Sequence, residues 1–284
     1  YPALLKAAIR FIPGLQTYRR WYVYQVAEAL TSMIRHPKTL GRVGQAQSSI
    51  FMRLQLKDPA IRRRAWPDYT FGCKRVLFSS FFLTTLQQQH VTLVTDTITK
   101  VTPTGLITAA STEHKVDCII WATGFHTTEF MFPMDIIGAG RRSLHDTWRN
   151  GAYAHLGMTV PGFPSLLILY GPNTNTSGGS IIHYLESQAA YIRQALQQVQ
   201  QRGAAAIDVR SEVAASSDRE TQARFAGTAW THCDSWYRTE QGRVVANWPG
   251  FMREYSARTR TLNPDDFTFL PFLPTPAHSA GSTG

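Results

Sequence analysis

Apolar residues in the first part of the chain recur at helical spacing. Within residues 22–34, every fourth position of one face is apolar: Val26, Leu30 and Ile34. This spacing places the three side chains on one side of an α-helix. A second helix is expected over about 49–56, so residues 1–65 are predicted to be mostly helical.

The pattern changes to β-structure after residue 90. Short runs rich in β-branched residues occupy 91–94, 98–101 and 106–109. The last two runs flank Pro103-Thr104-Gly105, a combination typical of a turn. We therefore expect a β-hairpin around this turn, preceded by another strand.

Two other runs are mostly apolar, with Asp117 as the exception in the first, and each ends at a turn that contains glycine. Val116–Trp121 is followed by Ala122-Thr123-Gly124, and Leu166–Tyr170 is followed by Gly171-Pro172-Asn173. Continuous apolar runs of this length are typical of strands buried on both faces. In α/β proteins ligands bind beyond the carboxyl ends of such strands. Both glycine turns are therefore candidate ligand sites.

The remaining elements are predicted from periodicity and composition. A long helix is expected over about 180–201 with Ser180 as its N-cap, followed by a strand at 206–209 and a helix over 211–225. Residues 274–284 are rich in Pro, Gly, Ser and Ala, and are predicted to be a disordered tail.

Size and cysteine content narrow the class of protein. The chain has 284 residues, 43% of them hydrophobic and 17% charged, which suits one large or two modest globular domains. Its three cysteines are far apart, which favours a reduced, cytoplasmic setting without disulfides, and none has metal-site spacing. No run of 18 apolar residues is present to span a membrane.

The net charge of +10 suggests an anionic ligand. Arginines cluster at residues 19–20 and 62–64, yet neither cluster belongs to a recognisable nucleic-acid-binding motif. A phosphorylated cofactor explains the charge at least as well, so nucleic acid is not an expected partner.

One glycine-rich segment imitates a dinucleotide-binding fingerprint. Gly138-Ala139-Gly140 follows two isoleucines, but Arg141 and Arg142 come next and no βαβ pattern surrounds the segment. A true fingerprint needs a helix directly after the glycines and an acidic residue after the next strand. We therefore expect a surface connection here.

Three motifs in a fixed order carry a resemblance to a known family. Phe71-Gly72-Cys73-Lys74-Arg75 comes first, then Trp121-Ala122-Thr123-Gly124-Phe125, and then Tyr170-Gly171-Pro172-Asn173. This order resembles the C-terminal half of Baeyer–Villiger (class B) flavin monooxygenases of the 4-hydroxyacetophenone monooxygenase type. The resemblance extends from about residue 67 to residue 255.

The resemblance implies an α/β flavoprotein with two dinucleotide-binding, Rossmann-like domains, for FAD and for NADPH. The chain carries neither fingerprint and begins without methionine, so we expect a C-terminal portion whose N-terminal half is missing. Residues 1–85 would end the NADPH domain, 86–202 would form the C-terminal part of the FAD domain, and 203–273 would pack back on the NADPH domain.

The resemblance also assigns roles to residues. Arg75 matches the catalytic arginine over the flavin, and Lys74 matches a lysine near the 2′-phosphate of NADPH. A planar guanidinium suits an oxygen anion, whereas lysine suits a phosphate as a flexible point charge. Further cofactor-binding residues are implied in three places: Ala122, Thr123 and Gly124; Gly171, Pro172, Asn173 and Ser180; and Trp236.

The implied reaction is an NADPH- and O2-dependent insertion of oxygen beside the carbonyl of a small ketone, or onto a heteroatom. Two alternatives remain open from the sequence. The chain could be a non-catalytic remnant that serves as a structural or interaction module. It could also be part of an FAD/NADPH disulfide reductase, although no Cys-x-x-Cys motif is present.

Overall fold

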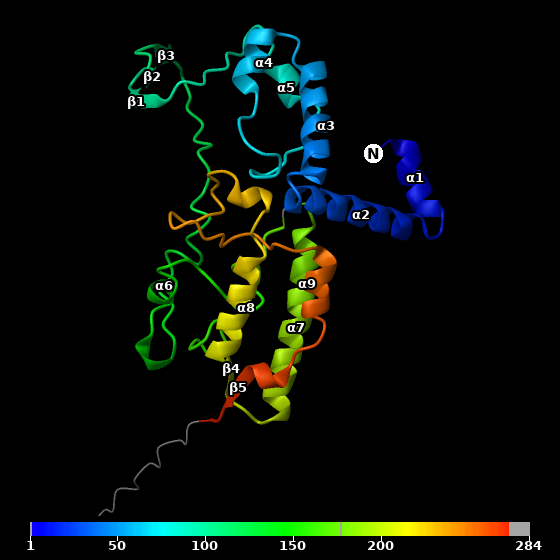
Figure 1. The fold of residues 1–284 in the computed structure, drawn as a ribbon, viewed down its shortest axis with the longest axis vertical. Coiled ribbons are helices and arrows are strands. Elements are labelled where there is room, and N and C mark those ends of the chain that lie inside the picture. Colours follow the sequence, from blue (N-terminus) through cyan, green and yellow to red (C-terminus); the bar gives the residue numbers. More distant parts are fainter. Residues whose placement is uncertain (1, 177, 273–284) are drawn as a thin grey trace, which may run out of the picture.

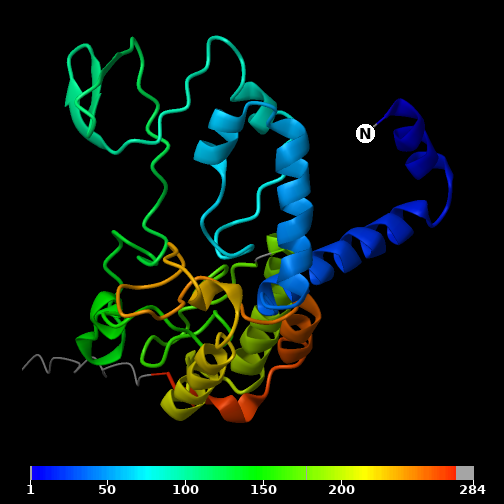
Figure 2. The same ribbon diagram turned by 45° about the horizontal axis from the view of Figure 1, so that its top comes forward.

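The computed structural model describes residues 2–176 and 178–272 (Figure 1). The first part is helical, as the sequence predicts. Its helices are α1 (Ala3–Phe11), α2 (Leu15–Arg35), α3 (Leu40–Gln55), α4 (Pro59–Ala65) and α5 (Phe82–Thr85). Helices α2 and α3 pack on each other, and both extend well beyond the two helices predicted here. In both views α1 and the outer half of α2 project from the body (Figures 1 and 2).

The predicted hairpin is confirmed as part of a three-stranded antiparallel sheet. Its strands are β1 (Ile98–Thr102), β2 (Gly105–Thr108) and β3 (Glu113–Lys115), in the order β1-β2-β3. Gly105 faces the carbonyl of His114 so closely that a Cβ would collide with it, which explains the glycine. The strand expected at 91–94 does not form. Figure 2 shows this small sheet standing apart from the helical body.

The body is built around a long helix, α7 (Ile181–Gln201), with α8 (Ser211–Ala223) and α9 (Met252–Arg258) beside it (Figure 1). Strand β4 (Ala206–Val209) pairs antiparallel with β5 (Phe267–Leu270), at the lower end of the body in Figure 1. Short elements complete it: η1 (Ala139–Arg141), α6 (Leu144–Thr147), η2 (Ala229–Thr231) and η3 (Pro264–Asp266). The predictions for α7, β4 and α8 are confirmed. Ser180 occupies the N-cap position of α7, but its hydroxyl accepts no capping hydrogen bond.

The two apolar runs predicted as buried strands are not strands in this structure. Residues 116–121 and 166–170 pair with no strand among the described residues. Ile120 is 86% exposed and Phe125, just beyond the run, is 89% exposed. A strand buried on both faces needs neighbouring strands and covering layers. The described part of the chain supplies neither for residues 116–125.

Three further points bear on the sequence predictions. The segment around Gly138 forms the short turn η1 and not a long helix, so the expectation that it is no dinucleotide fingerprint is confirmed. The predicted disordered tail, 274–284, lies outside the described residues. Within the ranges described above, no helix combines the length and apolar character needed to cross a membrane.

A buried histidine predicts acid sensitivity. His155 is 6% exposed, and neither ring nitrogen has a hydrogen-bond partner within the described chain. Burial lowers the pKa of His155 below its ordinary value of 6.5, with Asp266 opposing the shift and Arg258 adding to it. Below pH 6.5 the unfolded chain therefore takes up a proton that the folded chain does not accept.

We expect the free energy of unfolding to fall as the pH drops from about 7 towards 5, and to level off below the folded-state pKa. His155→Phe should flatten this part of the pH profile in urea titrations followed by circular dichroism. Exposed His90→Gln is the control and should leave it unchanged. An unaltered slope in His155→Phe would show that another group is responsible.

Candidate active site

The loop before Lys74 and Arg75 is anchored in the protein core. Cys73 donates its backbone N–H to the carbonyl of Thr70 (3.0 Å), which closes a turn. Gly72 has a φ of +82°, and any Cβ on it would collide with Ile34 of α2. Cys73 is completely buried, whereas Lys74 and Arg75 are exposed. The turn therefore fixes the backbone at Cys73 and leaves the next two cations facing outward.

Neither cation is neutralised by a carboxylate in the described chain. The Lys74 ammonium lies over the ring of Tyr69, 4.6 Å from its centroid. Burial raises the pKa of the Tyr170 phenol, and the positive charge of Arg75 partly offsets that rise. Arg75 and Tyr170 therefore lie within electrostatic reach of each other, although they come from separate segments.

Aromatic residues of the C-terminal part join the same region. An electrostatic interaction with Tyr237 also raises the pKa of the Tyr170 phenol. Its ring meets the neighbouring ring of Trp236 edge-on, with centroids 5.8 Å apart. Thr127 donates its hydroxyl hydrogen to the Trp236 carbonyl. Trp236 is therefore held beside the segment that follows the Ala-Thr-Gly turn.

Gly124 lies next to this tryptophan. It has a φ of +94°, and a Cβ built on it would be 3.8 Å from Cζ3 of Trp236. This is ordinary van der Waals contact, so the glycine is required by its backbone conformation and not by crowding within this chain. Ala122 and Thr123 are exposed beside it. A series of pairwise links thus leads from Arg75 through Tyr170, Tyr237 and Trp236 to Gly124, which places these residues in one region.

The predicted Gly171-Pro172-Asn173 site has a different character, because all three residues are buried. The Asn173 side-chain amide donates to the carbonyls of Val244 and Asn247, both at 2.9 Å. Both hydrogens of the amide are therefore used to hold the turn against the segment that contains Val244 and Asn247. Through Asn173, the 171–173 turn ties the C-terminal segment to the body.

The start of α7 packs against other helices. A Cβ on Gly178 would lie 3.0 Å from the Ala27 carbonyl of α2, and the Ser180 N–H lies 3.4 Å from the Met252 sulfur of α9. The Ser180 side chain itself is exposed. Within the described chain no hydrogen bond joins Ser180 to Arg75.

Tyr170 and Tyr237 are the site residues that sequence reasoning missed. Each directly adjoins a predicted residue, Gly171 in one case and Trp236 in the other. Their positions next to predicted site residues could therefore have indicated that they belong to the site. Their approach to Arg75 was not visible from the sequence, because it depends on how distant segments pack.

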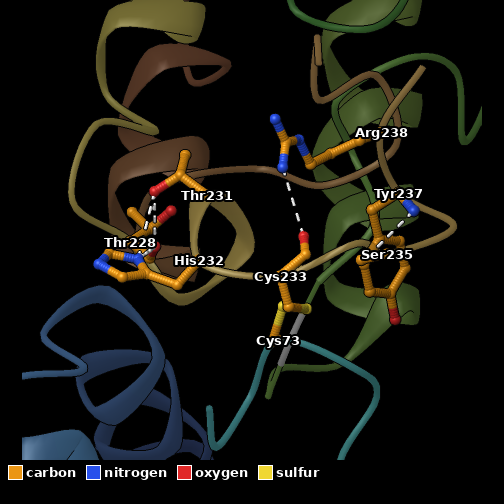
Figure 3. The surroundings of a disulfide bond; sticks show 8 residues. All are labelled: Cys73, Thr228, Thr231, His232, Cys233, Ser235, Tyr237 and Arg238. Atoms are coloured by element: carbon orange, nitrogen blue, oxygen red, sulfur yellow. Dashed lines mark hydrogen bonds between the residues drawn. A yellow bond between two sulfur atoms is a disulfide. The ribbon is translucent and has the colours of Figure 1, made fainter. Parts of the chain in front are cut away.

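The expectation that the cysteines stay unpaired is wrong. Cys73 and Cys233 form a disulfide, with their Cα atoms 6.3 Å apart (Figure 3). They are separated by 160 residues, so sequence spacing gave no sign of their proximity. Cys118 is free and exposed. The bond joins the segment of Lys74 and Arg75 directly to the segment of Trp236 and Tyr237.

Solved structures define the class of fold. A steroid monooxygenase bound to NADP matches 82% of this chain and 46% of its own length, with a TM-score of 0.73 and 26% identity. OTEMO in complex with FAD and NADP matches 82% of this chain and 45% of its own, with a TM-score of 0.74 and 26% identity. The chain therefore has part of an α/β, two-dinucleotide-domain flavoprotein fold, as predicted.

Curated relatives define the family. A Baeyer–Villiger monooxygenase of Streptomyces coelicolor is 33% identical over 96% of this chain and 53% of its own length. The FAD-binding monooxygenase ktnD of Aspergillus niger is 35% identical over 91% of this chain and 44% of its own. No family model matches. The chain is a member of the Baeyer–Villiger and related FAD-binding monooxygenases, and it spans about half the length of the curated relatives it matches.

Proposed function

We propose that this chain is part of a flavin monooxygenase that uses NADPH and O2 to insert one oxygen beside a ketone carbonyl, or onto a heteroatom of a small molecule. The observation that carries the proposal is that residues of three distant motifs lie in one region: Trp236 packs beside Gly124 and Tyr237, and Arg75 is within electrostatic reach of Tyr170. The matched OTEMO structure holds FAD and NADP together, which supports the same pair of cofactors here.

The residues present fit the reacting end of these cofactors. Lys74 and Arg75 are exposed cations without carboxylate partners, and Trp236 offers an exposed aromatic surface. Gly124 presents backbone without a side chain. When bound, reduced flavin supplies the electrons that activate O2. The role of Arg75 is to hold negative charge that develops on oxygen, because its donors are fixed before the reaction.

The other residues orient the cofactors. Lys74 would hold the 2′-phosphate of NADPH as a point charge, and Trp236 would offer its ring to the nicotinamide. Ala122, Thr123 and Gly124 let backbone approach the ring system closely. Gly171, Pro172 and Asn173 shape the turn before α7, whose N-terminal end at Ser180 favours negative charge on the flavin.

The exposed apolar segment indicates what completes the site. Ile120, Trp121 and Phe125 are all more than half exposed, although their pattern is that of a buried strand. We propose that the N-terminal half of the same monooxygenase covers them. Residues 1–85 would then end the NADPH domain, 86–202 would belong to the FAD domain, and 203–273 would pack on the NADPH domain. We place the protein in the cytoplasm, where NADPH is the available reductant.

The function is tested with the protein encoded by the whole reading frame that contains this chain. Purified with FAD, it should consume NADPH faster when a ketone or a thioether is added, and yield an ester or a sulfoxide. A protein that retains no flavin and consumes no NADPH would support the remnant alternative. NADPH-dependent reduction of disulfides without oxygenation would support the reductase alternative.

Gly124 gives a prediction specific to flavin loading. Gly124→Val in the flavin-loaded enzyme should lower the ratio of visible to ultraviolet absorbance, because valine disfavours a φ of +94° and fills space beside the ring system. Gly140→Val is a matched control: its φ is +63°, and no atom lies within 4 Å of its Cβ position. Equal flavin loss in both variants would mean that backbone strain alone is responsible.

A further inference from the structure

We propose that the Cys73–Cys233 disulfide is a reversible, peroxide-sensitive tether that positions Lys74 and Arg75 opposite Trp236 and Tyr237. This inference rests on the proposed function for its catalytic consequence, whereas the redox chemistry of the bond can be tested without a flavin.

Both cysteines are supported at bonding distance by their surroundings. They belong to one apolar cluster, whose buried members include Ile34 of α2 and Trp230 of η2. The Gly72 turn fixes the approach of Cys73. On the other side, the carbonyl of Cys233 accepts a hydrogen bond from Arg238 at 3.3 Å (Figure 3). The two sulfur atoms are thus brought together by packing that does not itself require the bond.

The segment beyond Cys73 depends on this anchor. Residues 74–78 make no backbone hydrogen bond within the described chain, and most of them are exposed. The segment beyond Cys233 is better ordered: Val245 donates to the Tyr237 carbonyl at 3.1 Å, and Arg243 and Thr239 are also paired. The disulfide therefore joins a weakly held segment with the predicted catalytic arginine to a firmly held one with Trp236.

Exposure gives the two thiols different roles. Cys233 is partly exposed, whereas Cys73 is completely buried. The Cys233 thiolate attacks hydrogen peroxide, the O–O bond breaks, and a sulfenic acid and water form. The Cys73 thiol then attacks that sulfur, the S–S bond forms, and a second water leaves. Two thiols and one peroxide thus give one disulfide and two waters, and a cellular dithiol reverses the step.

The proposed enzyme supplies its own oxidant. Hydrogen peroxide is released when oxygen activated by a flavin monooxygenase is not transferred to substrate. In the cytoplasm, disulfides are usually transient and redox-sensing. Peroxide from failed turnovers would close the tether, restore the position of Arg75 and reduce further loss. The reduced enzyme should accordingly have a higher KM for NADPH and release more peroxide for each ester formed.

The first test uses the purified chain and needs no cofactor. After mild peroxide treatment, denatured protein should show one reactive thiol, Cys118, and after reduction it should show three. Amide exchange at Cys73, which is buried and donates its N–H to the Thr70 carbonyl, should become about tenfold faster on reduction, while the middle of α7 stays unchanged. Three free thiols after peroxide, or identical exchange in both states, would overturn the proposal.

Variants separate positioning from simple stabilisation. Cys233→Ser should reproduce the reduced state at every peroxide concentration, and Cys118→Ser is the matched control that should behave like the wild type. If Cys73→Ser unfolds, Cys233→Ser and reversible reduction of the wild type still decide the question. In the flavin-loaded enzyme, a severalfold rise in the KM for NADPH, with an unchanged kcat for NADPH consumption, supports a positioning role of the disulfide. A uniform loss of folded protein, with the KM unchanged, contradicts it.

Discussion

Arg75→Ala in the flavin-loaded enzyme is expected to consume NADPH and O2 yet release hydrogen peroxide in place of ester. Removing one preorganised charged donor from a reacting centre typically costs about 3–4 kcal/mol, or two to three orders of magnitude in rate. FAD should remain bound, because Arg75 is exposed and pairs with no carboxylate in the described chain. Peroxide and ester are measured together during NADPH consumption.

Two further substitutions separate charge from geometry. Arg75→Lys should rescue only partly, because lysine lacks the planar pair of donors. Lys74→Ala should raise the KM for NADPH and leave oxygen transfer intact. Arg63→Ala, at an exposed arginine of α4, is the control. Undiminished ester formation by Arg75→Ala would remove Arg75 from the mechanism.

Gln188→Leu is expected to lower the free energy of unfolding by about 1–3 kcal/mol. Gln188 lies on α7 and is completely buried. Its side chain accepts a hydrogen bond from the Tyr170 N–H (3.0 Å) and donates one to the Tyr255 hydroxyl (2.9 Å), which donates to the Leu156 carbonyl (2.6 Å). Leucine fills similar space but leaves the Tyr170 N–H without this partner.

The matched control is Gln200→Leu, at an exposed position near the end of α7. Urea unfolding of the two variants should differ clearly in midpoint. A difference smaller than about 0.5 kcal/mol would show that water replaces the lost partner without penalty. Since Tyr170 lies within reach of Arg75, Gln188→Leu should also disturb the candidate site.

Much of the fold was predictable from periodicity alone. The helix at 181–201 has an apolar face at regular spacing, and the hairpin around Gly105 has a turn motif between two β-branched runs. The predictions of buried strands at 116–121 and 166–170 were wrong for the same physical reason. The mostly apolar character of these runs indicates burial between other strands and layers, and the described residues do not provide neighbouring strands for them.

The candidate site was predicted only in part. Arg75, Gly124 and Trp236 were found through motifs, and the structure brings them together. Asn173 was assigned to a cofactor, yet its amide is engaged with the carbonyls of Val244 and Asn247. The Cys73–Cys233 bond was missed because contacts between distant segments depend on packing that no local pattern encodes.

If Arg75, Gly124 and Trp236 belong to an NADPH- and O2-dependent oxygen-insertion site, one atom of O2 must appear in the product. Isotopic labelling of the product tests it most directly. The protein encoded by the reading frame that contains this chain is supplied with FAD, NADPH, a ketone and ¹⁸O2, and the product is analysed by mass spectrometry. We expect an ester with one ¹⁸O atom, and loss of this labelled product in Arg75→Ala. NADPH-dependent turnover that yields no labelled product from any ketone or thioether would contradict it.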